Sequence, residues 1–238
     1  MTSTGTYQYC RAVPEPPAAQ ADEIVADKPA SRAYRRQSLQ ARREDQYRRL
    51  IQAARDTFAE HGYHGTSIED IVGRAHVSRT SFYRFFSDKE ECLLAIFWTG
   101  SNIALRAVEE IASSDLPAEE RLREGVGVFL RLLAGDPAMA RVTLIEVMGA
   151  TRAAEEARVE VRERYVQIIE DYLNVSGLWK GRPKMETRLM AVAAMAGIGE
   201  AVSHLITTGR LDEWKQAVDP LGSFLVRALI PQDRRGRS

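Results

Sequence analysis

The sequence is poor in cysteine and has no excess of charge of either sign. It contains two cysteines, Cys10 and Cys92, and 33 lysines and arginines balance 33 aspartates and glutamates among 238 residues. Two cysteines so far apart argue against a disulfide framework and indicate a reducing cytoplasm. The N-terminus lacks the apolar core of a signal peptide, and no apolar run approaches the roughly eighteen residues that span a bilayer. We therefore expect a cytoplasmic protein without a membrane segment.

The motifs of common enzymes are also missing. The sequence has no Walker loop, no G-x-S-x-G, no H-E-x-x-H and no G-x-G-x-x-G after a strand. His61, His64 and His76 are close in sequence, but no cysteine or acid stands at zinc-site spacing from them. Glu200 and His204, four residues apart, favour an ion pair over an acid and base pair. We expect no catalytic site, no metal and no other cofactor.

The most informative stretch runs from Thr66 to Lys89. Thr66 and Glu69 fit a capping box at the start of a short helix. After a break at His76, Ser78 can cap a second short helix. The first helix would bury an apolar stripe at i, i+3, i+4 and i+7, formed by Ile68, Ile71, Val72 and Ala75.

The second short helix has two chemically different sides. Its inward side would be aromatic, and its outward side would carry hydroxyl, guanidinium and phenol groups. Two short helices joined by a tight turn, the second with such a face, are what a DNA-reading helix-turn-helix needs. The inward residues are Phe82, Phe85 and Phe86, and the outward ones are Arg79, Thr80, Ser81, Tyr83 and Arg84.

These residues resemble the tetracycline-repressor (TetR) family of bacterial transcription regulators. His76 replaces the glycine of the family's turn, where the backbone is usually left-handed. The resemblance implies an all-α fold, with an N-terminal three-helix DNA-binding domain followed by a larger helical ligand-binding and dimerisation domain. It is carried by Phe58, Gly62-Tyr63, Thr66-Ser67, Ile71, Ala75-His76-Val77-Ser78, Tyr83-Arg84-Phe85-Phe86 and Lys89-Glu90-Glu91.

The chain divides into four predicted parts. Residues 1–41 are expected to be a disordered tail that is basic at its end, 42–88 the helix-turn-helix domain, 89–230 the effector-binding and dimerisation domain, and 231–238 a second disordered tail. Seven arginines and two acids lie between Ser31 and Arg49. Two interpretations stay open: an arm that follows DNA phosphates or enters the minor groove, or a flexible tail with incidental arginines.

Helix signals recur along the whole chain. Gly62 is expected to end the first helix as a C-terminal cap, and Pro117 and Pro137 to begin later ones. The predicted helices cover residues 43–60, 89–112, 117–135, 137–148, 152–173 and 183–208, and a last helix begins with Asp219 as its cap and Pro220 as its first residue.

The resemblance assigns DNA contacts residue by residue. Arg79 has the fork that can bind guanine O6 and N7 together, and Arg84 could take a base or a phosphate. Tyr83 and Lys89 align with phosphate-contacting positions, as do the backbone N–H groups of the helix start. The full set is Arg43, Thr66, Ser67, Ser78, Arg79, Thr80, Ser81, Tyr83, Arg84 and Lys89.

The larger domain is rich in aromatic residues and methionine. In the family such residues line a pocket whose ligand releases the protein from DNA, although plain core remains the alternative for each of them. Few charges interrupt the apolar runs, which favours a small hydrophobic effector. The candidates are Phe97, Trp98, Phe129, Met139, Met148, Tyr165, Tyr172 and Met190.

The last third of the sequence indicates assembly. A line of small residues lets another helix approach closely, and the resemblance implies a homodimer built as a four-helix bundle. Burial inside a monomer is the alternative. The expected interface residues are Ala193, Gly197, Ala201, Leu205, Phe224, Leu225 and Ala228.

The sequence thus predicts a ligand-responsive repressor that binds a palindromic double-stranded operator as a homodimer. An all-α small-molecule-binding protein or enzyme with a vestigial helix-turn-helix is the alternative, and a scaffold that works through protein contacts alone is a third possibility. Specific, salt-dependent binding of DNA separates the first from the others.

Overall fold

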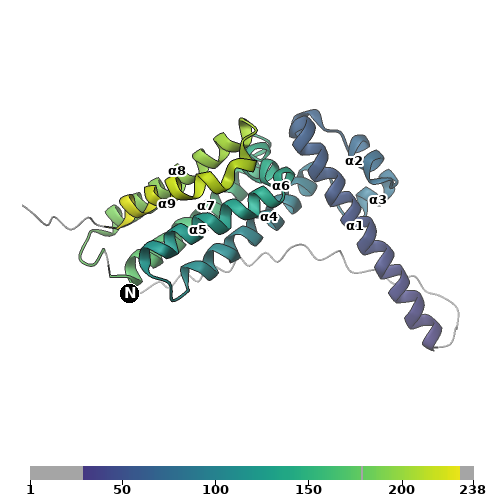
Figure 1. Ribbon diagram of the computed structural model, residues 1–238. Coiled ribbons are helices and arrows are strands. Elements are labelled where there is room, and N and C mark those ends of the chain that lie inside the picture. Colours follow the sequence, from purple (N-terminus) through teal and green to yellow (C-terminus); the bar gives the residue numbers. More distant parts are fainter. Residues whose placement is uncertain (1–28, 178, 231–238) are drawn as a thin grey trace, which may run out of the picture.

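The computed structural model describes residues 29–177 and 179–230, and within these ranges it is helical with no strand. The predicted all-α class is confirmed. Figure 1 shows α1, α2 and α3 together at one end, and the other helices side by side in a bundle. The helices are α1 Pro29–Gly65, α2 Ile68–Ala75, α3 Arg79–Tyr83, α4 Lys89–Ala112, α5 Ala118–Gly135, α6 Pro137–Arg141, α7 Arg152–Val175, α8 Lys184–Thr207 and α9 Trp214–Leu229, with a π-helical turn η1 Val142–Glu146 and a 3-10 turn η2 Leu211–Glu213.

The start of α2 is shifted by one residue from its predicted place. Ser67, and not Thr66, is the N-cap, because Ser67 Oγ accepts the Asp70 N–H at 3.1 Å and Asp70 Oδ2 accepts the Ser67 N–H at 2.8 Å. The Ser67 hydroxyl also donates to Asp70 Oδ2 at 2.6 Å, and this hydrogen bond, together with that from the Ser67 N–H, lowers the pKa of Asp70. Thr66 is buried, and its hydroxyl donates to the Gly62 carbonyl at 2.7 Å. The capping box predicted from Thr66 and Glu69 is therefore wrong.

The turn between α2 and α3 is held by an arginine of α1. His76 has φ 51° and ψ 47°, which confirms the left-handed backbone expected at this position. Arg49 Nε donates to the Ala75 carbonyl at 3.0 Å, and Arg49 Nη2 donates to the His76 carbonyl at 2.7 Å. The guanidinium satisfies carbonyls at the end of α2 that have no partner within the helix.

Two hydrophobic clusters make up the interior. The first contains the buried faces of α1, α2, α3 and α4 and continues through η1 into the first half of α7. The second joins α5, α8 and α9 with the end of α7. Both lie between helix faces that the apolar periodicity of the sequence marks as inward.

The first helix begins earlier than predicted. α1 starts at Pro29, so residues 29–41 are helical and the prediction that they are disordered is wrong. Proline is favoured at the first position of a helix, and the alanines, arginines and glutamines that follow are good helix formers. Gly62 interrupts α1, as predicted, but with φ 75° and ψ 165° its backbone is not the left-handed helical one of a glycine C-cap. The predicted tails at 1–28 and 231–238 lie outside the described residues.

Two later predictions are also corrected. The sequence predicts α-helix from Pro137 through Met148, but the segment after α6 forms the π-helical turn η1. The predicted last helix opens at Pro220, yet this residue lies inside α9, which begins at Trp214. Trp214 and Val218 pack against the second cluster, and this burial offsets the one backbone hydrogen bond that proline cannot donate.

One helix among the described residues is long and apolar enough to cross a membrane. This helix is α8, with a mean hydropathy of 1.6 over its most apolar window, so the expectation that no such run exists is wrong. A helix that packs inside a soluble bundle passes the same test. Exposed apolar side chains on α8, Met185 and Leu189, leave part of its surface uncovered in the single chain.

Gly62 offers a test of how the first helix ends. Its backbone lies in a region that is essentially restricted to glycine, and a Cβ there would lie 3.1 Å from Glu146 Oε2. We expect Gly62→Ala to lower the free energy of unfolding by about 1–3 kcal/mol. Gly73→Ala is the control, because a Cβ on this helical glycine meets no atom within 4 Å, and it should raise stability by about 0.5–1 kcal/mol. Urea titration measures both, and equal effects would contradict the argument.

Candidate nucleic-acid interface and ligand cavity

An aromatic cluster fixes the orientation of α3. The ring of Tyr47 on α1 lies 5.6 Å from the ring of Phe85 and 5.7 Å from that of Phe86. Phe82 is fully buried, 5.4 Å from Phe86. Because these rings occupy the inner side of α3 and the turn after it, the opposite side of the helix faces outward, as the sequence predicts.

The outward side of α3 presents groups that can read or hold DNA. Arg79, Thr80, Tyr83 and Arg84 are exposed, and so is the cap residue Ser78. Arg79 donates to Tyr83 Oη at 3.2 Å and to Glu69 Oε1 at 2.5 Å, and these contacts raise the pKa of the guanidinium. Arg84 has no side-chain partner among the described residues. A bidentate guanine contact by Arg79 would therefore replace its pair with Glu69.

Three residues that the sequence predicts to contact DNA form hydrogen bonds within the protein instead. Ser81 is buried, and its hydroxyl lies 2.9 Å from that of Ser78, so the prediction that it faces outward is wrong. The N–H of Thr66 donates to the Tyr63 carbonyl at 3.4 Å. The N–H of Ser67 is bound to Asp70. Neither N–H group is free for an anion, which corrects the expectation for the start of α2.

Two cations that the sequence predicts to contact DNA, Lys89 and Arg43, also make contacts within the N-terminal part of the protein. Lys89 Nζ donates to the carbonyls of Tyr63 and Thr66, both at 2.7 Å, and lies 4.3 Å from the Tyr63 ring centroid. Partial burial lowers the pKa of Lys89, and one of its three N–H groups remains for a phosphate. Arg43 lies over the Phe85 ring at 5.7 Å. Periodicity could not reveal these contacts, because each joins segments far apart in sequence.

The larger domain contains a cavity of about 550 Å³, partly open to solvent, between α4, α5, α6, η1, α7, α8 and α9. This volume is within the range of small-molecule sites. Six of the eight predicted pocket residues line it: Phe97, Phe129, Met139, Met148, Tyr165 and Tyr172. Trp98 and Met190 do not line it; Trp98 packs against the first cluster and Met190 against the second.

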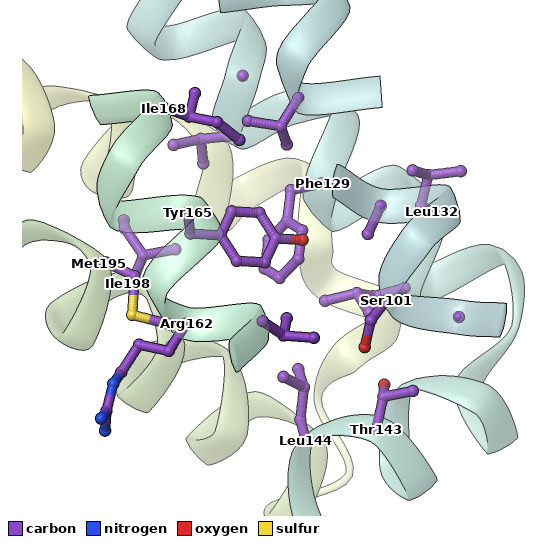
Figure 2. A pocket seen from close by; sticks show the side chains of 18 of the residues that line it. Ser101, Phe129, Leu132, Thr143, Leu144, Arg162, Tyr165, Ile168, Met195 and Ile198 are labelled. Carbon is purple, nitrogen blue, oxygen red and sulfur yellow. The ribbon is translucent and has the colours of Figure 1, made fainter. Parts of the chain in front are cut away.

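Hydroxyl groups interrupt the apolar lining. In Figure 2 the Tyr165 ring stands in front of Phe129, and its hydroxyl points toward the side where Ser101 and Thr143 lie. Burial raises the pKa of Tyr165, so the phenol stays protonated. The hydroxyls of Tyr165 and Ser101 have no partner among the described residues, whereas Thr143 donates to the Met139 carbonyl at 2.8 Å. The two open hydroxyls can bind a polar group of a ligand.

Arginines border the same cavity. Arg158 is paired with Glu155 at 2.7 Å, and Arg121 donates to the Leu116 carbonyl at 2.8 Å. Arg162 has no ion pair or hydrogen bond among the described residues. In Figure 2 its guanidinium points away from the cavity side chains while its stem lies beside them. A ligand with an apolar body and an anionic head therefore fits this site.

Asp136 connects the cavity to the DNA-binding helices. This residue lines the cavity, and its Oδ1 caps α6 by accepting the Met139 N–H at 3.0 Å. Its Oδ2 accepts from Arg55 Nη1 on α1 at 2.6 Å. Met139 also packs closely on α4, since a Cβ at Gly100 would lie 2.7 Å from Met139 Sδ. A ligand that moves Met139 would therefore strain two links to the DNA-binding helices: the pair of Asp136 with Arg55, and the contact of Met139 with α4. Sequence reasoning missed this pair because 81 residues separate its members.

The predicted interface residues divide between surface and interior. Ala193 and Phe224 are exposed. Leu225 is buried in the second cluster and lines the cavity, which corrects its assignment to the interface. A Cβ at Gly197 would lie 2.9 Å from Phe224 Cζ, so the absence of a side chain at Gly197 lets α9 of the same chain pack against α8. Ala201 is half-buried, and Leu205 and Ala228 pack beside the second cluster.

Comparisons with known proteins agree with this arrangement. Residues 50–96 match the model of the bacterial regulatory proteins of the tetR family. The chain is 27% identical over 192 residues to the fatty acid metabolism regulator protein of Bacillus subtilis strain 168, an alignment that covers 77% of this chain and 93% of that protein.

Solved structures share the fold. The fatty acid degradation regulator FadR from Bacillus halodurans superposes with a TM-score of 0.67 and 25% identity, over 81% of this chain and 97% of that one. FadR from B. subtilis, solved in complex with stearoyl-CoA, gives a TM-score of 0.66 and 24% identity, over 76% and 98% of the two chains. Residues 50–96 therefore match the DNA-binding helices of the tetR family of bacterial regulatory proteins, and the whole chain resembles solved bacterial regulators in its helical fold.

Proposed function

We propose that this chain is a cytoplasmic, homodimeric transcriptional repressor that releases a palindromic operator when a long-chain acyl thioester or acid fills its cavity. The observation that carries the proposal is a cavity for an amphipathic ligand whose wall, at Asp136, is ion-paired to the first DNA-binding helix. The similarity to regulators of fatty acid metabolism supports the acyl class of effector.

The roles of the DNA-facing residues follow from their exposure. Arg79 and Thr80 at the start of α3 are placed to reach base edges, while Tyr83, Arg84 and the third N–H group of Lys89 are placed to hold phosphates. Two copies of α3 are needed to read a palindrome. The exposed apolar side chains of α8 and α9, among them Leu189 and Phe224, support pairing of these helices in a dimer.

Release from DNA is a shift between two arrangements of the same dimer. The effector prefers the arrangement in which the two α3 helices are wrongly spaced for the operator, and it weakens DNA binding by its differential affinity. Two links pass through the cavity wall: α4, which runs from α3 into the larger domain, and the Asp136–Arg55 pair.

The first prediction concerns base reading by Arg79. Arg79→Ala should weaken operator binding by about 1–3 kcal/mol and relax the preference at one base pair, because alanine cannot form the forked pair of hydrogen bonds with guanine. Arg79→Lys keeps the charge without the fork, so it should lose the preference while retaining more affinity. Glu69→Gln should bind more tightly, since it releases Arg79 from its ion pair. A scan of single-base operator variants measures all three, and an unchanged preference in Arg79→Ala would overturn the assignment.

The second prediction concerns the head group of the effector. Arg162→Gln should weaken the binding of a long-chain acyl-CoA about tenfold or more, because a charge-assisted hydrogen bond is removed. Binding of the neutral alcohol of equal chain length should not change, and neither should operator affinity without ligand. Calorimetry measures the ligands. If wild-type protein bound its operator but acyl-CoA neither bound nor released it, the acyl class would be rejected.

The third prediction concerns the link between the two sites. Asp136→Asn removes the charge that holds Arg55 and keeps an N-cap for α6, since asparagine caps as well as aspartate. We expect acyl-CoA to bind this variant normally but to change its operator affinity at least about fivefold less than in the wild type. Arg55→Met should give the same result, and the double variant should add nothing further. Full release in either single variant would show that the pair is not the link.

A further inference from the structure

The N-terminal part of α1 extends beyond the bundle to which the helix belongs. Leu50 is the first fully buried residue of α1, and residues 37–42 are all exposed. Figure 1 shows this end of α1 projecting alone past α2 and α3, on the side away from α4 to α9. We call residues 29–43 the α1 extension. Its fifteen residues span about 22 Å at 1.5 Å per residue.

The sequence of the α1 extension is basic, with its arginines at helical spacing. It contains five arginines, at positions 32, 35, 36, 42 and 43, and no acidic residue. At 3.6 residues per turn these positions fall within about 120° of the helix circumference. Like charges at such spacings destabilise an isolated helix, and the exposed residues bury no apolar face that would offset this. An anionic partner along this side would remove the repulsion.

One end of the α1 extension lies beside the end of α3. Arg43 lies over the ring of Phe85, the residue that directly follows the exposed Arg84 at the end of α3. Six residues further along α1, Arg49 holds the turn before α3. The α1 extension therefore begins beside the end of α3, and its helix axis continues past the three DNA-binding helices.

We propose that the α1 extension is a second DNA-binding element, which follows the phosphate backbone beside the segment read by α3. Duplex DNA carries one negative charge for every 1.7 Å or so of its axis, so a helix of this length meets several phosphates. The uniform positive charge favours DNA over a second copy of this chain, whose own α1 extension would repel it. The proposal rests on the proposed function, because it requires an operator bound by α3.

The test compares full-length proteins on duplexes selected by the wild-type chain from a random-sequence library. Each site is made once with minimal ends and once with flanks of about one helical turn, roughly 10 base pairs. The variant replaces Arg32, Arg35, Arg36 and Arg42 with alanine, which preserves helix propensity. The matched control replaces the same four residues with lysine and so keeps the charge.

We expect the alanine variant to bind the flanked duplex on the order of tenfold more weakly near 0.1 M salt, with a slope of log K against log salt that is smaller by about 0.9 for each phosphate that the variant no longer neutralises. The lysine variant should behave like the wild type. Hydroxyl-radical footprints should lose protection in the flank and keep it in the segment read by α3.

Each other outcome contradicts the inference in a recognisable way. Equal affinity and equal salt slope for the wild type and the alanine variant would reject DNA contact by the α1 extension, while loss of binding in Arg79→Ala alone would leave the proposed function standing. A change of oligomeric state in sedimentation, without any effect on DNA binding, would assign the extension to a second copy. If the wild type selected no DNA, the proposed function would fail and this inference with it.

Discussion

The three DNA-binding helices do not have a hydrophobic core of their own. Phe58 and Phe82, the largest fully buried side chains of this part, belong to one cluster with Phe97 of α4, Val142 of η1 and Val161 of α7. A close-packed interior transmits displacements, because its side chains have few voids into which to relax. The orientation of α3 therefore depends on how η1 and α7 are placed, although no residue of either element belongs to the helix-turn-helix.

The cavity lies where a ligand can act on this dependence. Its walls come from both clusters: Phe97 and Val161 belong to the first, and Val126 and Ile198 to the second. A ligand between two clusters sets the distance between them, and only the first cluster includes the DNA-binding helices. The π-helical turn η1 forms part of this wall through Thr143. π-Helical turns are rare and recur at functional sites.

Local sequence rules correctly predicted a helix cap that depends only on neighbouring residues. Ser78 caps α3 by accepting the Ser81 N–H, as its hydroxyl group predicts. The rules failed where tertiary contacts choose between two acceptable local solutions. Thr66 and Ser67 are both good caps with an acid three residues on, and the burial of Thr66 selected Ser67. The family resemblance likewise assigned eight aromatic and methionine residues to a pocket, and six of them line the cavity, but it could not show that Trp98, unlike its neighbour Phe97, lies away from the cavity.

The cations around α3 separate into those that build the surface and those that remain free on it. Arg49 and Lys89 donate to backbone carbonyls at helix ends, whereas Arg84 and Arg42 have no such partner among the described residues. Removing either kind weakens DNA binding, but for different physical reasons. Loss of a bracing cation leaves carbonyls unsatisfied and lowers stability, while loss of a free cation changes the number of counterions released and leaves stability nearly unchanged. Affinity at a single salt concentration cannot distinguish the two, so the role of each arginine is defined by its salt slope together with its free energy of unfolding.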